Sequence, residues 1–155
     1  MSGPGARSGA SRLVVVLNGP NLDLLGEREP DVYGRATLDQ HLDAVRHAAG
    51  PLGLAVEDLQ SNHEGDLVDA IHDARGRAAA IVINPGALTH YAWALHDALA
   101  AFPGPVVEVH LSNPAAREGW RRTSVVSPVA TGTITGLGGL GYVLAVEACA
   151  HLLGP

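Results

Sequence analysis

Apolar runs alternate with amphipathic windows along almost the whole chain. Five runs have the length and composition of β-strands, and they span residues 12–18, 54–60, 78–84, 105–113 and 130–136. The first and third are nearly continuous in Val, Ile, Leu and Ala, which is typical of strands buried on both faces. The second alternates apolar and polar residues, which predicts an edge strand with one solvated face.

Helical periodicity fills the intervals between these strands. Apolar residues recur every three or four positions in windows that begin near residues 38, 64 and 92, and a helix rich in Ala, Val and Leu is predicted near the C-terminus. Two of the helix starts carry a capping-box pattern, Thr37 with Gln40 and Ser61 with Glu64. This alternation predicts an α/β fold with a doubly wound parallel sheet of five strands, covered by helices on both faces in three layers.

Length and composition favour one domain. A chain of 155 residues with 46% hydrophobic residues can build one core of ordinary size, so we expect residues 12–155 to form a single α/β domain. Residues 1–11 are small, polar and glycine-rich, which predicts a disordered tail rather than a signal peptide. There is no apolar stretch long enough to predict a transmembrane helix. The single cysteine, Cys149, excludes an intrachain disulfide and favours a cytoplasmic location.

Charge and motifs exclude several kinds of chemistry. The net charge of -6 argues against a nucleic-acid partner. All ten basic residues are arginines, so a lysine Schiff base is excluded, and guanidinium groups are well suited to holding carboxylates. The eight histidines form no HxH or HExxH pair. The glycine motif at residues 136–141 comes after the last predicted strand, where a dinucleotide loop would not lie. These patterns therefore favour neither a zinc site of the usual spacing nor a dinucleotide-binding loop.

Polar residues follow the longest buried strands at their carboxyl ends, which is where doubly wound folds bind ligands. They are Asn21, Asn84, His90, Glu108, His110, Ser112 and Asn113. An asparagine after a strand is also a common turn former, and a histidine within an apolar strand is commonly a hydrogen-bonded structural residue. Both alternatives stay open here. Glu108 lies two residues before His110 on the same strand face and can orient the imidazole, which favours an acid–base role.

The segment NLDLLGEREPDVYGR, residues 21–35, shows no regular periodicity and predicts a loop. A phenol is a poor base near neutral pH unless a cation stabilises its anion, and Arg28 is such a cation if the loop folds Tyr33 back toward it. A tyrosinate base and His110 as acid together describe a dehydration next to a carbonyl. A loop between Gly26 and Gly34 can also close over a substrate. The alternative is a surface loop with Tyr33 packed on the domain.

Long segments resemble the type II 3-dehydroquinate dehydratases. They are LNGPNLDLLGEREPDVYG, QSNHEGDLVDAIH, INPGALTHYAWALHDAL and VEVHLSN followed by AREGWRR, and the similarity runs from about Arg12 to Leu153. The resemblance implies a flavodoxin-like fold, no cofactor or metal, and a homododecamer built as four trimers. It also implies dehydration of 3-dehydroquinate to 3-dehydroshikimate, by anti elimination through an enolate, in the shikimate pathway of aromatic amino acid biosynthesis. The unrelated type I enzymes use a lysine Schiff base, which this chain lacks.

The resemblance also assigns roles residue by residue. It makes Tyr33 the base, with Arg28 stabilising its phenolate, and His110 the acid, supported by Glu108. Asn21 would hold the water that stabilises the enolate. The substrate carboxylate would be bound by Asn84 and the backbone amides of Leu111 and Ser112, and the ring hydroxyls by His90 and Arg121, with Asp97 contributed by a neighbouring subunit. Arg117 is assigned to the closed lid around the site.

Two alternatives to this function stay open. Pro114, Ala115, Thr123 and Val125 depart from the residues usual in that family, so an amino analogue of dehydroquinate remains a candidate substrate. A flavodoxin-like domain that binds a small ligand without catalysis is the alternative of a different class. A binding domain needs no strong base, so the presence of Tyr33, Arg28 and His110 together favours the dehydratase.

Overall fold

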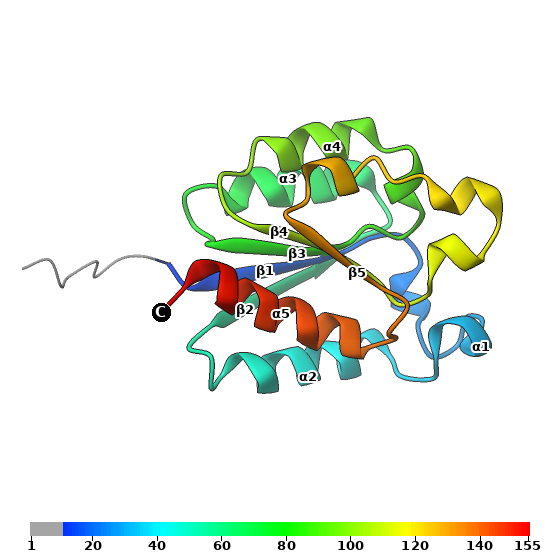
Figure 1. The fold of residues 1–155 in the computed structure, drawn as a ribbon, viewed down its shortest axis with the longest axis horizontal. Coiled ribbons are helices and arrows are strands. Elements are labelled where there is room, and N and C mark those ends of the chain that lie inside the picture. Colours follow the sequence, from blue (N-terminus) through cyan, green and yellow to red (C-terminus); the bar gives the residue numbers. More distant parts are fainter. Residues whose placement is uncertain (1–10) are drawn as a thin grey trace, which may run out of the picture.

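A five-stranded parallel sheet forms the centre of the molecule (Figure 1). The computed structural model describes residues 11–155, so most of the tail predicted to be disordered lies outside the described residues. The strands are β1 (Leu13–Asn18), β2 (Ala55–Gln60), β3 (Ala80–Asn84), β4 (Val106–His110) and β5 (Gly132–Thr135). Their order is β2-β1-β3-β4-β5, with every neighbouring pair parallel. The predicted doubly wound, flavodoxin-like sheet is confirmed, and the alternating strand β2 lies at its edge.

Helices cover both faces of this sheet. The longer ones are α2 (Leu38–Ala49), α3 (Glu64–Ala74), α4 (Trp93–Ala100) and α5 (Leu140–Leu153), and α1 (Pro30–Tyr33) is a single turn. Figure 1 shows α2 and α5 on one face and α3 and α4 on the other, which gives the three predicted layers. Short 3₁₀ segments span Leu22–Leu24, Gly86–His90, Pro114–Ala116, Gly119–Arg122 and Ser127–Val129. Among the described residues, no helix is long and apolar enough to cross a membrane.

The apolar runs of β1, β3 and β4 are buried because residues of each of these strands pack into cores on both faces of the sheet. Val16 and Val82 contribute to the core beneath α2 and α5, whereas Leu17 and Ile83 contribute to the core beneath α3 and α4. Each such side chain contributes roughly 1.5–3 kcal/mol when it is fully removed from water. Packing in the two cores fixes the positions of these strands, and therefore of the turns that leave their carboxyl ends.

One of the two predicted capping boxes is present. The amide of Gln40 donates to Oγ1 of Thr37 at 3.2 Å, and the amide of Thr37 donates to Oε1 of Gln40 at 2.9 Å. The second prediction, at Ser61, is wrong. The Ser61 hydroxyl donates to Oδ2 of Asp66 at 2.6 Å and accepts from the amide of His63 at 3.0 Å, so α3 begins after His63 instead.

Close contact between two turns shapes the carboxyl edge of the sheet. Asn18 and Asn84 end the neighbouring strands β1 and β3 in register. The amide of Gly19 donates to the carbonyl of Asn84 at 2.8 Å. A Cβ atom on Gly19 would lie 2.3 Å from the carbonyl oxygen of Pro85, so only glycine allows this approach. The chain leaving β1 therefore runs directly beside the chain leaving β3.

Candidate active site

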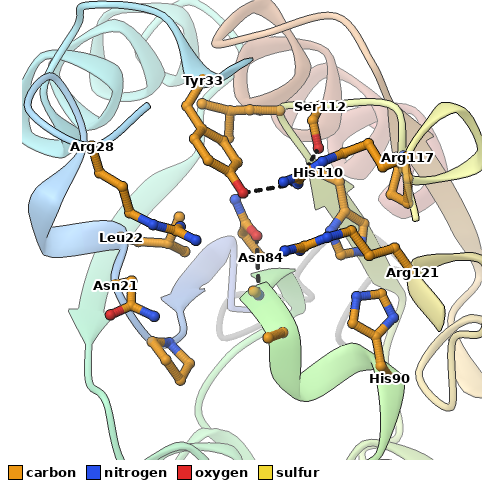
Figure 2. Close-up of a pocket in the computed structure, with 15 residues that line it drawn as sticks. Asn21, Leu22, Arg28, Tyr33, Asn84, His90, His110, Ser112, Arg117 and Arg121 are labelled. Carbon is orange, nitrogen blue, oxygen red and sulfur yellow. Dashed lines mark hydrogen bonds between the residues drawn. The ribbon is translucent and has the colours of Figure 1, made fainter. Parts of the chain in front are cut away.

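A cleft with an empty volume of about 580 Å³ lies beyond the carboxyl ends of β1, β3 and β4. Figure 2 shows Arg28, Tyr33 and Asn21 on one side of it and Arg117, Arg121 and His90 on the other, with Asn84 between them. It is lined by Pro20, Asn21, Leu22, Arg28, Tyr33, Asn84, Gly86, Ala87, His90, His110, Leu111, Ser112, Pro114, Arg117 and Arg121. Of the residues predicted at this site, Glu108, Asp97 and Asn113 are absent from this lining.

The loop over residues 21–35 contains more regular structure than its sequence predicts. A 3₁₀ turn follows Asn21, and α1 ends at Tyr33. Pro30 favours the start of α1 because its φ is already close to the helical value. Gly26 and Gly34 have φ values of 92° and 84°, in the left-handed region that favours glycine. These two glycines let the loop fold back so that Tyr33 faces the cleft.

Tyr33 lies between two arginines (Figure 2). Nη1 of Arg117 donates to the phenolic oxygen of Tyr33 at 2.8 Å. The guanidinium carbon of Arg28 lies 5.0 Å from the centroid of the Tyr33 ring, and Arg28 also pairs with Glu29 at 3.5 Å. The sequence suggested Arg28 as the cation that stabilises the phenolate. In the structure the hydrogen bond to the phenolic oxygen comes from Arg117, while Arg28 contacts the ring.

His110 and Glu108 form a close pair at the end of β4. Nε2 of His110 lies 2.5 Å from Oε2 of Glu108. A carboxylate can only accept hydrogen bonds, so Nε2 carries the proton in this contact and Nδ1 is left for other partners. The Glu108 side chain is 1% exposed. The hydroxyls of Thr89 and Ser127 donate to its two oxygens at 2.7 and 2.6 Å, and that of Ser124 lies at 3.1 Å.

These contacts determine the charge of Glu108. Burial alone raises the pKa of its carboxyl group. The hydrogen bond and charge of His110, together with the hydroxyls of Ser127 and Thr89, lower this pKa by a larger amount. The net pKa lies below the ordinary value, so Glu108 is an anion near neutral pH. The buried Glu108 anion holds the Nε2–H of His110 and so fixes the orientation of the imidazole ring, whose other nitrogen, Nδ1, is left for the substrate.

Donor groups converge at the base of the cleft. Asn84 is 3% exposed, its Oδ1 accepts from the amide of Gly86 at 3.2 Å, and its Nδ2 donates to the phenol of Tyr142 at 3.0 Å. The backbone amides of Leu111 and Ser112 donate to no other protein group within residues 11–155. A carboxylate accepts several hydrogen bonds, so these groups can together bind one.

Aromatic and cationic side chains form the wall opposite Tyr33. Nδ1 of His90 lies 2.6 Å from the carbonyl oxygen of Thr123, and its ring meets the Trp120 ring edge-on at a centroid distance of 5.1 Å. The guanidinium carbon of Arg121 lies 4.1 Å from the centroid of Trp120. Asp97 lies on the exposed surface of α4, outside the cleft of its own chain. Within residues 11–155, no three His, Cys, Asp or Glu side chains are grouped to hold a metal.

The model of the family described as dehydroquinase class II matches residues 12–150. The chain belongs to this family. It is 59% identical over 137 residues to 3-dehydroquinate dehydratase 2 of Pseudomonas aeruginosa, a match that covers 88% of this chain and 93% of the relative. It is 52% identical over 135 residues to 3-dehydroquinate dehydratase of Halalkalibacterium halodurans, a match that covers 87% and 93% of the two chains.

A solved structure agrees with these relatives. The crystal structure of type II dehydroquinase from Propionibacterium acnes superposes with a TM-score of 0.87 at 46% identity, and the match covers 91% of this chain and 97% of that one. The family predicted from sequence is confirmed, and so is the prediction of an enzyme rather than a binding domain.

The sequence of this class II dehydroquinase did not predict several contacts in the site. Arg117 is 84 residues from the tyrosine that it contacts, so no local pattern reveals the pair. The hydroxyls of Thr89, Ser124 and Ser127, which donate to Glu108, lie in segments between the helices and strands, and no sequence pattern there predicts this contact. Of the residues that depart from the family pattern, Pro114 lines the cleft, whereas Ala115, Thr123 and Val125 do not.

Proposed function

We propose that this dehydroquinase converts 3-dehydroquinate to 3-dehydroshikimate and water, the reaction for which its relatives are named. One observation supports the proposal most strongly. A single cleft joins a tyrosine that accepts a hydrogen bond from arginine at 2.8 Å to a histidine that lies 2.5 Å from a buried carboxylate. These are the groups that a dehydration next to a ketone requires, one to remove a proton and one to supply a proton to the departing hydroxyl.

In the proposed mechanism, the phenolate of Tyr33 removes the C2 proton beside the ketone. The electrons of the C–H bond move onto the carbonyl oxygen and form an enolate. The enolate then collapses, a C1–C2 double bond forms, and the C1 hydroxyl leaves as water with a proton from His110. Arg117 and Arg28 stabilise the phenolate before the transfer. Because Tyr33 gains a proton and His110 loses one, both must exchange with solvent before the next turnover.

Base and acid approach the substrate from opposite faces in this proposal, so the elimination is anti. Asn21 holds the water that stabilises the enolate, and its backbone amide is itself held by Oδ1 of Asn62 at 3.0 Å. Asn84 and the amides of Leu111 and Ser112 bind the substrate carboxylate. His90 and Arg121 bind the ring hydroxyls.

The proposal includes a homododecamer of four trimers. Asp97 is exposed on α4 and lies outside the cleft of its own chain, so it can act only in the cleft of another copy. In each trimer, Asp97 of one subunit would complete the site of its neighbour. The proposed reaction itself uses no metal and no cofactor.

The test is to add 3-dehydroquinate to metal-free protein and to follow the ultraviolet absorbance of the conjugated enone carboxylate that forms. We expect a rise with the wild type, loss of the rise with Tyr33→Phe, and retention with Tyr91→Phe, which removes a hydroxyl from an exposed tyrosine outside the cleft. A well-folded wild type that gives no rise would contradict the proposal. The amino analogue of dehydroquinate would then be the next substrate to test.

A further inference from the structure

Tyr142 is a buried tyrosine whose hydroxyl reaches the base of the cleft from below. It lies in the first turn of α5 and is 0% exposed. Its ring stacks against the imidazole of His41, at a centroid distance of 5.7 Å. Its side chain does not line the cleft, but its hydroxyl contacts Asn84, which does. Packing holds the ring in place, so the hydroxyl has a fixed position beneath the ends of β1 and β3.

The hydrogen bonds around this hydroxyl have one consistent direction. Oδ1 of Asn84 accepts from the amide of Gly86 at 3.2 Å, which turns Nδ2 toward Tyr142. Nδ2 then donates to the Tyr142 oxygen at 3.0 Å. The Tyr142 hydroxyl in turn donates to Oδ1 of Asn18 at 2.6 Å. Burial raises the pKa of the Tyr142 phenol, so its proton is retained for this bond.

This arrangement leaves one hydrogen of the Asn84 amide for the cleft. A carboxamide nitrogen has two hydrogens, and Tyr142 accepts one of them. The Asn84 carboxamide accepts one hydrogen bond from Gly86 and donates one to Tyr142, and these two bonds fix the plane of the amide. The second hydrogen then has a single direction in which to point, and binding a substrate group there costs little reorientation.

We propose that Tyr142 is a positioning residue, whose hydroxyl orients the Asn84 carboxamide for the carboxylate of the substrate. This inference rests on the proposed function, because it assumes that Asn84 binds that carboxylate. Tyr142 does not touch the substrate and acts only through Asn84. The opposing interpretation is that Tyr142 is an ordinary core residue whose hydroxyl stabilises the fold without affecting the site.

A double-mutant cycle separates these two interpretations. Tyr142→Phe removes the hydroxyl and keeps the ring, and we expect KM for 3-dehydroquinate to rise roughly three- to tenfold while kcat changes less than about twofold. In an Asn84→Ala background, Tyr142→Phe should change KM by less than about twofold, because its effect passes through Asn84. Cys149→Ala is the matched control, since it removes one heavy atom from the same helix and core. It should leave KM unchanged.

The same variants give a readout that does not depend on turnover. In protein labelled with ¹⁵N-asparagine, the side-chain amide signals of Asn84 are assigned by their absence in Asn84→Ala. We expect these signals to shift and to exchange faster with water in Tyr142→Phe but not in Cys149→Ala. Unchanged Asn84 signals, or an equal rise in KM with and without Asn84, would overturn the inference. An inactive wild type in which the Asn84 signals still respond would contradict the proposed function and leave the positioning role of Tyr142 supported.

Discussion

Replacing Arg117 by methionine should slow the reaction far more than it weakens substrate binding. Nη1 of Arg117 donates to the Tyr33 oxygen at 2.8 Å and lies 3.4 Å from the hydroxyl of Ser112. A hydrogen bond to a charged group contributes about 1.5–3 kcal/mol, and 1.36 kcal/mol corresponds to a tenfold change in rate. We therefore expect kcat to fall roughly 10- to 150-fold in Arg117→Met, because the phenolate loses its nearest cation.

The assay is steady-state kinetics on 3-dehydroquinate with two comparison variants. Arg117→Lys keeps a positive charge but not the planar guanidinium, so it should recover part of kcat. Arg75→Met removes the same charge from a position outside the cleft and should behave like the wild type. If Arg117→Met kept more than half of the wild-type kcat, the hydrogen bond to Tyr33 would have no catalytic role.

Three further predictions concern stability and assembly. Thr37→Ala should lower the free energy of unfolding by about 1 kcal/mol in urea titrations, because it removes the cap of α2, and an unchanged midpoint would contradict this. Ser127→Ala removes a hydrogen-bond donor to Glu108, whose pKa is lowered in the folded protein. The stability that this contact provides is therefore present above about pH 4.5, the ordinary pKa of a glutamate, and is lost as pH falls through the lower pKa of the folded state. The deficit of this variant should be roughly 1–2 kcal/mol at pH 7 and should become smaller as pH falls below about 4.5, and a deficit that did not change with pH would show that Glu108 is not involved. Mixing subunits of Asp97→Asn and Tyr33→Phe should restore activity by joining an intact Tyr33 to an intact Asp97 from the neighbour, and mixed assemblies as inactive as their parents would argue against a shared site.

The fold could be predicted from sequence because its main determinants are local. Each buried strand is an apolar run, each long helix has an apolar face, and Thr37 and Gln40 lie at the spacing of a capping box. The interpretation was wrong at Ser61, where the spacing is the same but the hydroxyl donates a hydrogen bond to Asp66 and α3 begins after His63. A capping box needs the serine oxygen to accept from the amide three residues later, but Ser61 accepts from the amide of His63, and the spacing of the sequence does not distinguish these two arrangements.

Contacts between distant segments could not be predicted in the same way. The strand pattern shows that Glu108 and His110 share a face, and the structure places them 2.5 Å apart. The partner of Tyr33 depends on how the segment after β4 folds over the cleft, and no periodicity encodes that. Arg28, the nearer arginine in sequence, was the natural candidate for the phenolic oxygen, yet it lies over the ring. Sequence spacing therefore identifies pairs within one element more reliably than pairs across a cleft.

The stereochemistry of proton loss tests the proposed mechanism most directly. Two samples of 3-dehydroquinate, each carrying deuterium at one of the two C2 positions, would be converted by the enzyme and the products compared by NMR. We expect loss of the hydrogen anti to the C1 hydroxyl, with retention of the other, because Tyr33 and His110 are proposed to act from opposite faces of the ring. Loss of the syn hydrogen, or of both equally, would contradict Tyr33 as base and His110 as acid.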